Sequence, residues 1–168
     1  MNAPRKNMNA LLMILSVVLV STLTGSTNNY YNEPTDNKGF IDCSVAKKFG
    51  QISNISITPV PLKHGIMSYW KGSLQIKRTI QWGILHATLT HNFKNYTNIT
   101  FIDEQFNLCD FFVDMITEHC PIQPGIYHIG ASETIPKLFW PGQYYGEVTA
   151  YNEKGEQMMC LMKKITIY

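Results

Sequence analysis

Four cysteines are the side chains in this sequence whose type and number point most directly to chemistry. They are Cys43, Cys109, Cys120 and Cys160. An even set of cysteines in an exported chain predicts structural disulfides. Zinc binding is disfavoured, because structural zinc sites usually contain a close pair such as CxxC and none is present. Four cysteines permit three pairings, and their spacing alone does not choose among them.

The histidines and acidic residues do not form a catalytic pattern. The histidines are scattered singly along the chain: His64, His86, His91, His119 and His128. No GxSxG, HExxH or P-loop motif accompanies them, so we interpret them as surface or hydrogen-bonded residues. An acidic cluster comprises Asp103, Glu104, Asp110 and Asp114. EF-hand spacing for calcium is absent, and solvation explains the cluster better. We therefore expect no enzyme activity, no metal and no cofactor.

The first 26 residues have the composition of an export signal. Arg5 and Lys6 supply the positive segment, and residues 10–20 supply the apolar one. Small side chains at 24–26 offer a cleavage site. The apolar run is shorter than the roughly 20 residues of a membrane-spanning helix, although an uncleaved anchor is the alternative interpretation. Residues 27–38 are polar and aperiodic, which predicts a flexible tail.

The remaining residues, 39–168, suffice for one domain with one core. Arg5 and Lys6 are two of the 14 basic residues, so the chain after the leader carries 12 basic and 12 acidic side chains. Arg78 is the only arginine in that part. This balance argues against a nucleic-acid partner, which would require a basic surface. It also disfavours strong electrostatic docking on anionic membranes.

Three N-glycosylation sequons agree with export. They begin at Asn54, Asn95 and Asn98. We expect the processed protein to be secreted or to reside in the endolysosomal lumen.

Hydrophobic alternation predicts a protein built almost entirely of strands. Residues 70–77 and 85–90 alternate apolar and polar side chains with the period of two that half-buried strands show. Proline and glycine turns separate these segments from their neighbours. Further strands are predicted at 51–60, 126–129, 143–151 and 158–167. Several short strands with this spacing suggest an antiparallel sandwich.

Two segments carry finer predictions. Within the strand at 51–60, Ile55 and Ile57 share one predicted face, and Asn54 and Ser56 share the other. Residues 106–118 are the only candidate for a helix, and we interpret them as a short helical turn or a loop.

Seven segments together carry a resemblance to a known family. They are FIDC at 40–43, ISITPVPL at 55–62, KGSL at 71–74, NLCD at 107–110, CPIQPGIY at 120–127, IPKLFWPGQYYGEV at 135–148 and the closing segment 155–160. In order and spacing they resemble the ML lipid-recognition domain family, specifically its phosphatidylglycerol/phosphatidylinositol transfer protein branch. That branch is related to the Niemann–Pick sterol-transfer protein. Most members have a further disulfide near the start of the domain, which this chain lacks.

The resemblance implies an all-β fold, an immunoglobulin-like antiparallel β-sandwich with an apolar pocket between its two sheets. It also implies the disulfides Cys43–Cys160 and Cys109–Cys120. Alternation alone favours a dry core, whereas the resemblance favours a pocket lined by the inward-facing residues. These are Ile55, Ile57, Trp70, Leu74, Ile76, Leu85, Leu89, Phe101, Ile122, Tyr127, Phe139, Tyr144, Val148, Leu161 and Ile165. Tryptophan favours bilayer interfaces, and the predicted mouth or membrane contact comprises Ile66, Met67, Lys137 and Trp140.

The function implied by the resemblance is non-enzymatic lipid binding and transfer between membranes. The partners we expect are a phospholipid or sterol ligand and, transiently, a membrane surface, with no nucleic acid. We expect a monomer. An alternative is a recognition module that presents its lipid to a receptor or a hydrolase. A third possibility is a secreted sandwich that has no ligand.

Overall fold

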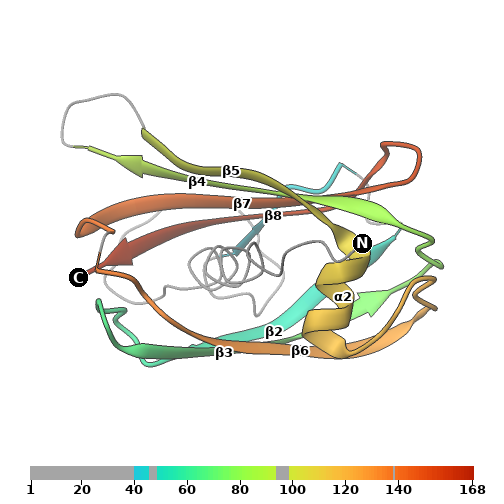
Figure 1. The fold of residues 1–168 in the computed structure, drawn as a ribbon, viewed down its shortest axis with the longest axis horizontal. Coiled ribbons are helices and arrows are strands. Elements are labelled where there is room, and N and C mark those ends of the chain that lie inside the picture. The colour runs from blue at the N-terminus through green and yellow to red at the C-terminus, as the bar shows by residue number, and fades with distance from the viewer. Residues whose placement is uncertain (1–39, 46–48, 94–98, 138) are drawn as a thin grey trace, which may run out of the picture.

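Two antiparallel sheets face each other in the computed structural model, which describes residues 40–45, 49–93, 99–137 and 139–168 (Figure 1). One sheet has the strand order β1-β8-β7-β4-β5 and the other the order β2-β3-β6. The described strands are β1 (Phe40–Asp42), β2 (Gly50–Thr58), β3 (Met67–Ile76), β4 (Gly83–Asn92), β5 (Ile99–Asn107), β6 (Gly125–Thr134), β7 (Gly142–Asn152) and β8 (Gln157–Ile167). The described helix is α2 (Leu108–Ile116). The predicted all-β sandwich is confirmed.

Alternation of burial along β3 and β4 explains why these sequences form the inner walls. In β4, Leu85, Ala87 and Leu89 are buried, while the side chains between them are partly exposed. In β3, Trp70, Leu74 and Ile76 are buried in the same way. Successive side chains of a strand point to opposite faces, so one face of each sheet joins the core. The strands predicted at 70–77 and 85–90 are therefore confirmed.

The facing predicted within 51–60 is confirmed, because Ile55 is buried and Ile57 packs against the core while Asn54 and Ser56 are exposed. The sequence did not predict a β-bulge that interrupts the alternation between Ile52 and Ile55. The pairing of β2 with β3 shifts register between Ser53 and Ser56, and Asn54 has φ +54°. A bulge of this kind inserts an extra residue and reverses the facing of the side chains that follow. Ile52 and Ile55, three residues apart, are consequently both buried.

Strand β5 was not predicted from the sequence. It lies at the edge of the larger sheet and pairs only with β4 along its length. Its side chains are mostly exposed or half-buried, with Asp103, Glu104 and Gln105 in succession. Charged residues are common on edge strands because they discourage pairing with other chains. They also remove the apolar alternation by which a strand is recognised.

Residues 106–118 contain a regular helix, so the interpretation as a turn or loop is corrected. The Asn107 side chain caps α2 by accepting a hydrogen bond from the Cys109 backbone N–H at 2.8 Å. Asp110 in the first turn suits the positive end of the helix dipole. The helix ends at Thr117, which has φ +58°.

The two ends of the sandwich differ in structure. At the end that we call the helix end, α2 lies beside the start of β4 and the start of β6 (Figure 1). At the opposite end, which we call the loop end, segments 59–66 and 135–141 connect the strands. Two disulfides are present, Cys43–Cys160 and Cys109–Cys120. This is the pairing that the family resemblance implied.

Candidate functional site

A cavity of about 60 Å³ lies between the two sheets in the half of the sandwich nearer the helix end. Its wall is entirely apolar. The lining residues are Phe49, Gly50, Ile52, Trp70, Leu74, Ile76, Ile80, Leu85, Leu108, Phe111, Phe112, Ile129, Val148, Ala150, Met158, Met159 and Leu161. Such a space offers no groups for acid–base or nucleophilic chemistry. It is suited to holding a hydrocarbon.

Strand alternation and helix periodicity both position this wall. Inward-facing residues of β3 and β4 supply two sides, among them Leu74 and Leu85. Helix α2 supplies the end wall through Leu108, Phe111 and Phe112. These three positions lie on one face of a helix because residues three and four apart are neighbours there.

The structure divides the predicted pocket residues into two groups. Those that line the cavity are Trp70, Leu74, Ile76, Leu85, Val148 and Leu161. The others belong to the core or pack against it outside the cavity wall: Ile55, Ile57, Leu89, Phe101, Ile122, Tyr127, Phe139, Tyr144 and Ile165. All fifteen side chains thus belong to the hydrophobic core or pack against it, but fewer than half line the cavity.

Several lining residues were not predicted. They include Phe49, Ile80, Leu108, Phe111, Phe112, Ala150 and Met158. The apolar spacing of Leu108, Phe111, Phe112 and Met115 could have identified the helix wall, since it matches one face of an amphipathic helix. Ala150 continues the alternation of β7. The sequence around Phe49 has no periodicity that could have placed it.

Aromatic rings fill the interior at the loop end. Phe101 stacks on Phe139 with ring centroids 5.9 Å apart, and both rings contact Tyr144 at 5.7 and 5.8 Å. His91 lies 4.4 Å from Tyr144, and Trp140 lies 5.7 Å from Phe101. Offset and edge-to-face contacts of this kind stabilise a core beyond the burial of area. This end is therefore packed, whereas the helix end is hollow.

Two polar side chains are enclosed in this aromatic cluster. The Tyr144 hydroxyl donates a hydrogen bond to the Trp140 backbone carbonyl at 2.8 Å, and burial raises the Tyr144 pKa to about 12. Neither ring nitrogen of His91 has a hydrogen-bond partner in the described part of the structure. A Cβ atom at Gly142 would lie 2.6 Å from His91 Nε2, so this glycine is required by close packing.

The residues predicted as a mouth lie at the loop end, away from the cavity. Trp140 is 51% exposed, and Ile66 and Met67 are 46% and 44% exposed. Lys137 is also exposed. Their exposure suits contact with a surface, but the packed aromatic cluster separates them from the hollow region.

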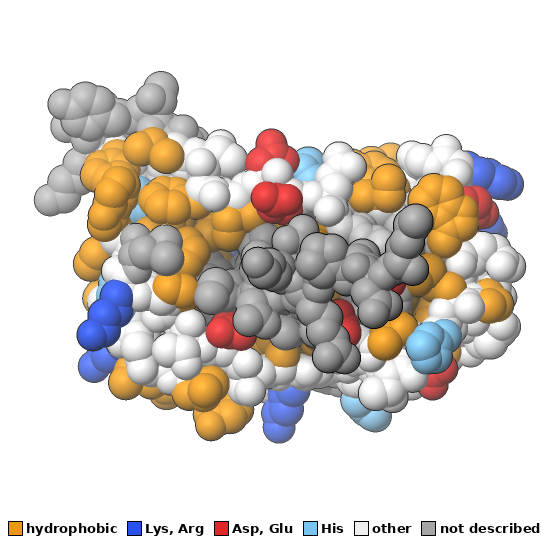
Figure 2. All heavy atoms as spheres, viewed as in Figure 1, with side chains coloured by type: hydrophobic (Ala, Val, Ile, Leu, Met, Phe, Trp, Pro, Cys, Tyr) orange, Lys and Arg blue, Asp and Glu red, His pale blue; other side chains and the backbone are white. Residues whose placement is uncertain are grey.

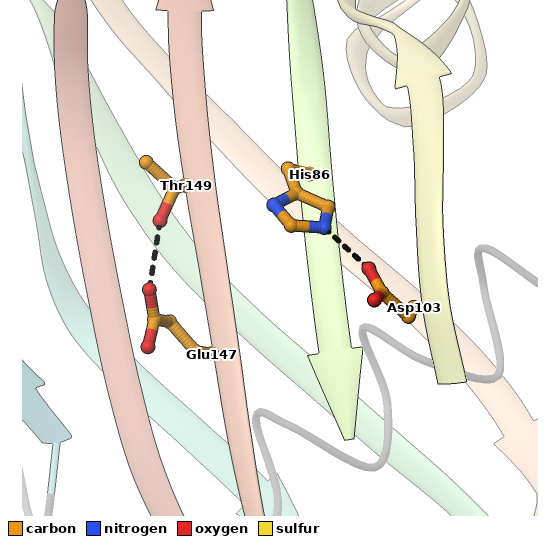
Figure 3. A network of polar contacts seen from close by, with 4 residues as sticks. All are labelled: His86, Asp103, Glu147 and Thr149. Atoms are coloured by element: carbon orange, nitrogen blue, oxygen red, sulfur yellow. Dashed lines mark hydrogen bonds and ion pairs between the residues drawn. The ribbon is translucent and has the colours of Figure 1, made fainter. Parts of the chain in front are cut away.

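Polar pairs are found on the outer face of the larger sheet (Figure 3). His86 Nε2 lies 2.6 Å from Asp103 Oδ1, and the Thr149 hydroxyl donates to Glu147 at 3.2 Å. His86 alternates with the inward-facing Leu85 and Ala87, so its side chain points away from the cavity.

Of the three predicted glycosylation sites, Asn54 is exposed at the bulge of β2. Asn95 and Asn98 lie outside the described residues, and so do the leader and tail predicted at 1–38. Within the described residues, no helix has the length and apolar character needed to cross a bilayer.

The chain is similar to known proteins in both sequence and structure. A family model for the ML domain matches residues 38–167. The chain is 31% identical over 71 residues to the phosphatidylglycerol/phosphatidylinositol transfer protein of Schizosaccharomyces pombe. That match covers 42% of this chain and only 38% of the length of the yeast protein.

Two solved structures share the fold. A Niemann-Pick type C2 protein from Japanese carpenter ant superposes with a TM-score of 0.55 at 12% identity, over 76% of this chain and 99% of the ant protein. Chicken MD-1, solved in complex with lipid IVa, superposes with a TM-score of 0.52 at 13% identity, over 77% of this chain and 88% of MD-1. The family match spans nearly the whole described domain, and the sandwich agrees with it. The chain therefore belongs to the ML domain family.

Proposed function

We propose that this protein binds a lipid in the cavity between its sheets and transfers it between membranes without covalent chemistry. The observation that carries the proposal is the wholly apolar cavity at the helix end, enclosed by both sheets and α2. The name of the yeast phosphatidylglycerol/phosphatidylinositol transfer protein supports a lipid as the ligand. Phospholipids and sterols are the two ligand classes that we propose.

The energetics of transfer require an enclosed apolar site. Removing a lipid from a bilayer gives up about 0.8 kcal/mol for each buried methylene. A lipid with about 30 methylenes therefore loses more than about 20 kcal/mol, which a surface groove would not replace. The cavity of about 60 Å³ is smaller than the roughly 150 Å³ cavity that holds benzene in another protein. We therefore propose that the two sheets move apart and widen the cavity when a lipid enters.

Two disulfides support a lumenal or extracellular location, because they persist in oxidising compartments. We propose that the protein is secreted or resides in the endolysosomal lumen. Chicken MD-1, which shares the fold, was solved with lipid IVa. As a second candidate function we propose presentation of a bound lipid to a receptor or hydrolase.

Native mass spectrometry of the protein expressed through a secretory route tests the binding proposal. We expect a stoichiometric lipid mass that disappears after organic extraction. A protein that carries no lipid, even after incubation with mixed phospholipid and cholesterol vesicles, would contradict it. Transfer of fluorescent lipid between vesicles then separates the candidates. Binding without transfer would favour presentation.

We further propose that exposed side chains at the loop end contact the membrane. Hydrophobic side chains gather at this end of the face shown in Figure 2, and Ile66, Met67 and Trp140 are each more than two-fifths exposed. Tryptophan is favoured at the bilayer interface, and Lys137 lies in the same loop region.

The helix end provides a matched control for this contact. Trp82 is 50% exposed there, close to the 51% of Trp140. Trp140→Ala is expected to slow vesicle-to-vesicle transfer at least threefold, and Trp82→Ala to leave it unchanged. The reverse order of effects would move the membrane contact to the helix end. Lipid binding measured in the absence of vesicles should be the same for both variants.

A further inference from the structure

Lys163 is a charged residue on the inner face of the larger sheet. It lies in β8 between Leu161 and Ile165, which are both buried and alternate with outward-facing residues. Lys163 itself is only 2% exposed. Among the described residues, it is the only lysine, arginine, aspartate or glutamate that is buried. Buried lysines are rare because removing an ammonium group from water is costly.

Lys163 is protonated at neutral pH in spite of its burial. Its Nζ lies 3.8 Å from the centroid of the Phe40 ring, a cation–π contact with the neighbouring strand. Burial lowers the Lys163 pKa to about 8, so the amine still carries its charge at neutral pH. On the other side, Lys163 pairs with Gly146, which has no side chain. The position thus places a buried positive charge beside a residue that has no side chain.

The sheet register places this charge just beyond the cavity. Val148 and Leu161 are paired and both line the cavity, and the next inward-facing pair is Gly146 and Lys163. Two residues of extended strand correspond to about 7 Å. From Lys163 back through Leu161 to the start of β8 at Gln157, the strand extends over six residues, or about 20 Å. That distance is comparable with the extended chain of a long-chain fatty acid.

A second donor in the same interior also points to a ligand oxygen. Trp70 is 3% exposed and lines the cavity from the smaller sheet. Its indole N–H has no hydrogen-bond partner in the described part of the structure. Buried donors are nearly always paired in native proteins, so an acceptor brought in by a ligand would satisfy this group.

We propose that Lys163 binds the terminal anionic group, carboxylate or phosphate, of a single-chain lipid whose acyl chain extends through the cavity toward the helix end. The inference rests on the proposed function, because it requires a lipid in the cavity, and it adds single-chain anionic lipids to the phospholipids and sterols proposed above. Charge-assisted hydrogen bonds are roughly twice as strong as neutral ones. They gain further strength in a poorly solvated interior. Lys163 would therefore select acids over neutral lipids of the same length.

Calorimetric titration at pH 7 with three ligands of equal chain length tests this selection. The ligands are palmitate, hexadecyl phosphate and hexadecanol. We expect the wild-type protein to bind at least one of the two anions at least tenfold more tightly than the alcohol. Lys163→Met keeps an unbranched apolar side chain and removes the ammonium group, so it should abolish the preference while leaving hexadecanol binding unchanged. Comparison of palmitate with hexadecyl phosphate identifies the preferred anion.

Lys164→Met is the matched control, because Lys164 is exposed on the opposite face of the same strand. This variant loses the same charge and should retain the preference for anions. Equal binding of all three ligands by the wild-type protein would overturn the inference without touching the proposed function. Full retention of the preference in Lys163→Met would overturn it as well. Failure of every long-chain ligand and of membrane lipids to bind would refute the proposed function itself, and the inference with it.

Competition with free anions tests whether the binding of the anionic group depends on the acyl chain. Acetate and inorganic phosphate, at the concentrations used for the lipids, should not displace bound palmitate, because they lack the chain that occupies the cavity. Displacement by either ion would show an ion site that is independent of lipid and would overturn the inference. The comparison of acid with alcohol in the wild-type protein needs no substitution, so the test remains decisive if a variant folds poorly.

Discussion

The helix end and the loop end of the sandwich are built from similar apolar residues, yet one is hollow and the other is packed. At the helix end, Phe111 and Phe112 of α2 border a cavity. At the loop end, Phe101, Phe139 and Tyr144 contact one another directly. Inward-facing hydrophobic residues therefore identify the side chains between the sheets but do not locate the empty space among them. The space depends on how the side chains of two sheets and a helix meet.

Removal of the disulfides should have the largest effect on stability and should distinguish the two ends. Cys43→Ser with Cys160→Ser opens a loop with a sequence separation of 117, and should cost about 5 kcal/mol of unfolding free energy. Cys109→Ser with Cys120→Ser opens a separation of 11, at about 3 kcal/mol. Because the short loop contains α2, the second variant should also lose lipid binding at denaturant concentrations below global unfolding. Denaturant titration with tryptophan fluorescence and lipid binding measures both effects. Simultaneous loss of binding and fold would contradict a separately weakened helix end.

Substitution of Lys163, which lies between the two ends, should change stability in a pH-dependent way. Its pKa is lowered to about 8 in the folded protein by burial, from 10.5. The unfolded chain therefore holds this proton more tightly, and charged Lys163 opposes folding at pH 7 by at most about 3 kcal/mol. Between pH 8 and 10.5 the folded wild-type protein releases the proton first, so this penalty disappears as pH rises.

Lys163→Met should accordingly be more stable than the wild-type protein at pH 7, and its advantage should shrink from pH 8 to 10.5. Thermal unfolding of both proteins across that range checks the sign. The raised pKa of Tyr144 acts above pH 10 in both proteins and cancels in their difference. An advantage for Lys163→Met that grew with pH would contradict the burial of a charged amine.

Substitution of two glycines that have positive φ, Gly142 and Gly155, compares a tightly packed position with an open one. Gly142 at the loop end has φ +145°, and an added Cβ would lie 2.6 Å from His91 Nε2. Gly142→Ala should cost about 3 kcal/mol, from backbone strain together with overpacking. Gly155, in the turn between β7 and β8, has φ +72° and nothing within 4 Å of an added Cβ. Gly155→Ala should cost only about 1 kcal/mol. Equal losses in denaturant unfolding would show that the aromatic cluster can yield.

Substitution of Ala150 should change stability least, and its comparison with Ala87 in the same sheet is the sharpest test of the cavity. Ala150 is 3% exposed and lines the cavity, whereas Ala87 is fully buried outside it. Ala150→Leu should fill empty space, with stability changed by less than about 1 kcal/mol and lipid affinity reduced at least tenfold. Ala87→Leu has no space to fill and should cost about 2 kcal/mol. If Ala150→Leu binds lipid normally, the ligand lies elsewhere.

The sandwich class follows from local patterns in the amino-acid sequence. Period-two alternation at 70–77 and 85–90 follows directly from side chains that point to opposite faces of a strand. The ordered set of family motifs carried the match to the ML domain, together with the disulfide pairing that the structure contains. These features depend on local patterns along the chain, which the sequence displays.

Which buried residues line the cavity depends on packing between the sheets and the helix, and the sequence pattern did not predict it. Leu85 and Leu89 occupy equivalent positions in one alternating strand, but only Leu85 lines the cavity. The edge strand β5 escaped prediction because its exposed acids hide the alternation, and the bulge at Asn54 reversed the facing within β2. Alternation along β8 places Lys163 on the same face as Leu161 and Ile165, but only the packing of the strands around it shows that this lysine is buried. Packing between elements distant in sequence produces these differences, and no local pattern records it.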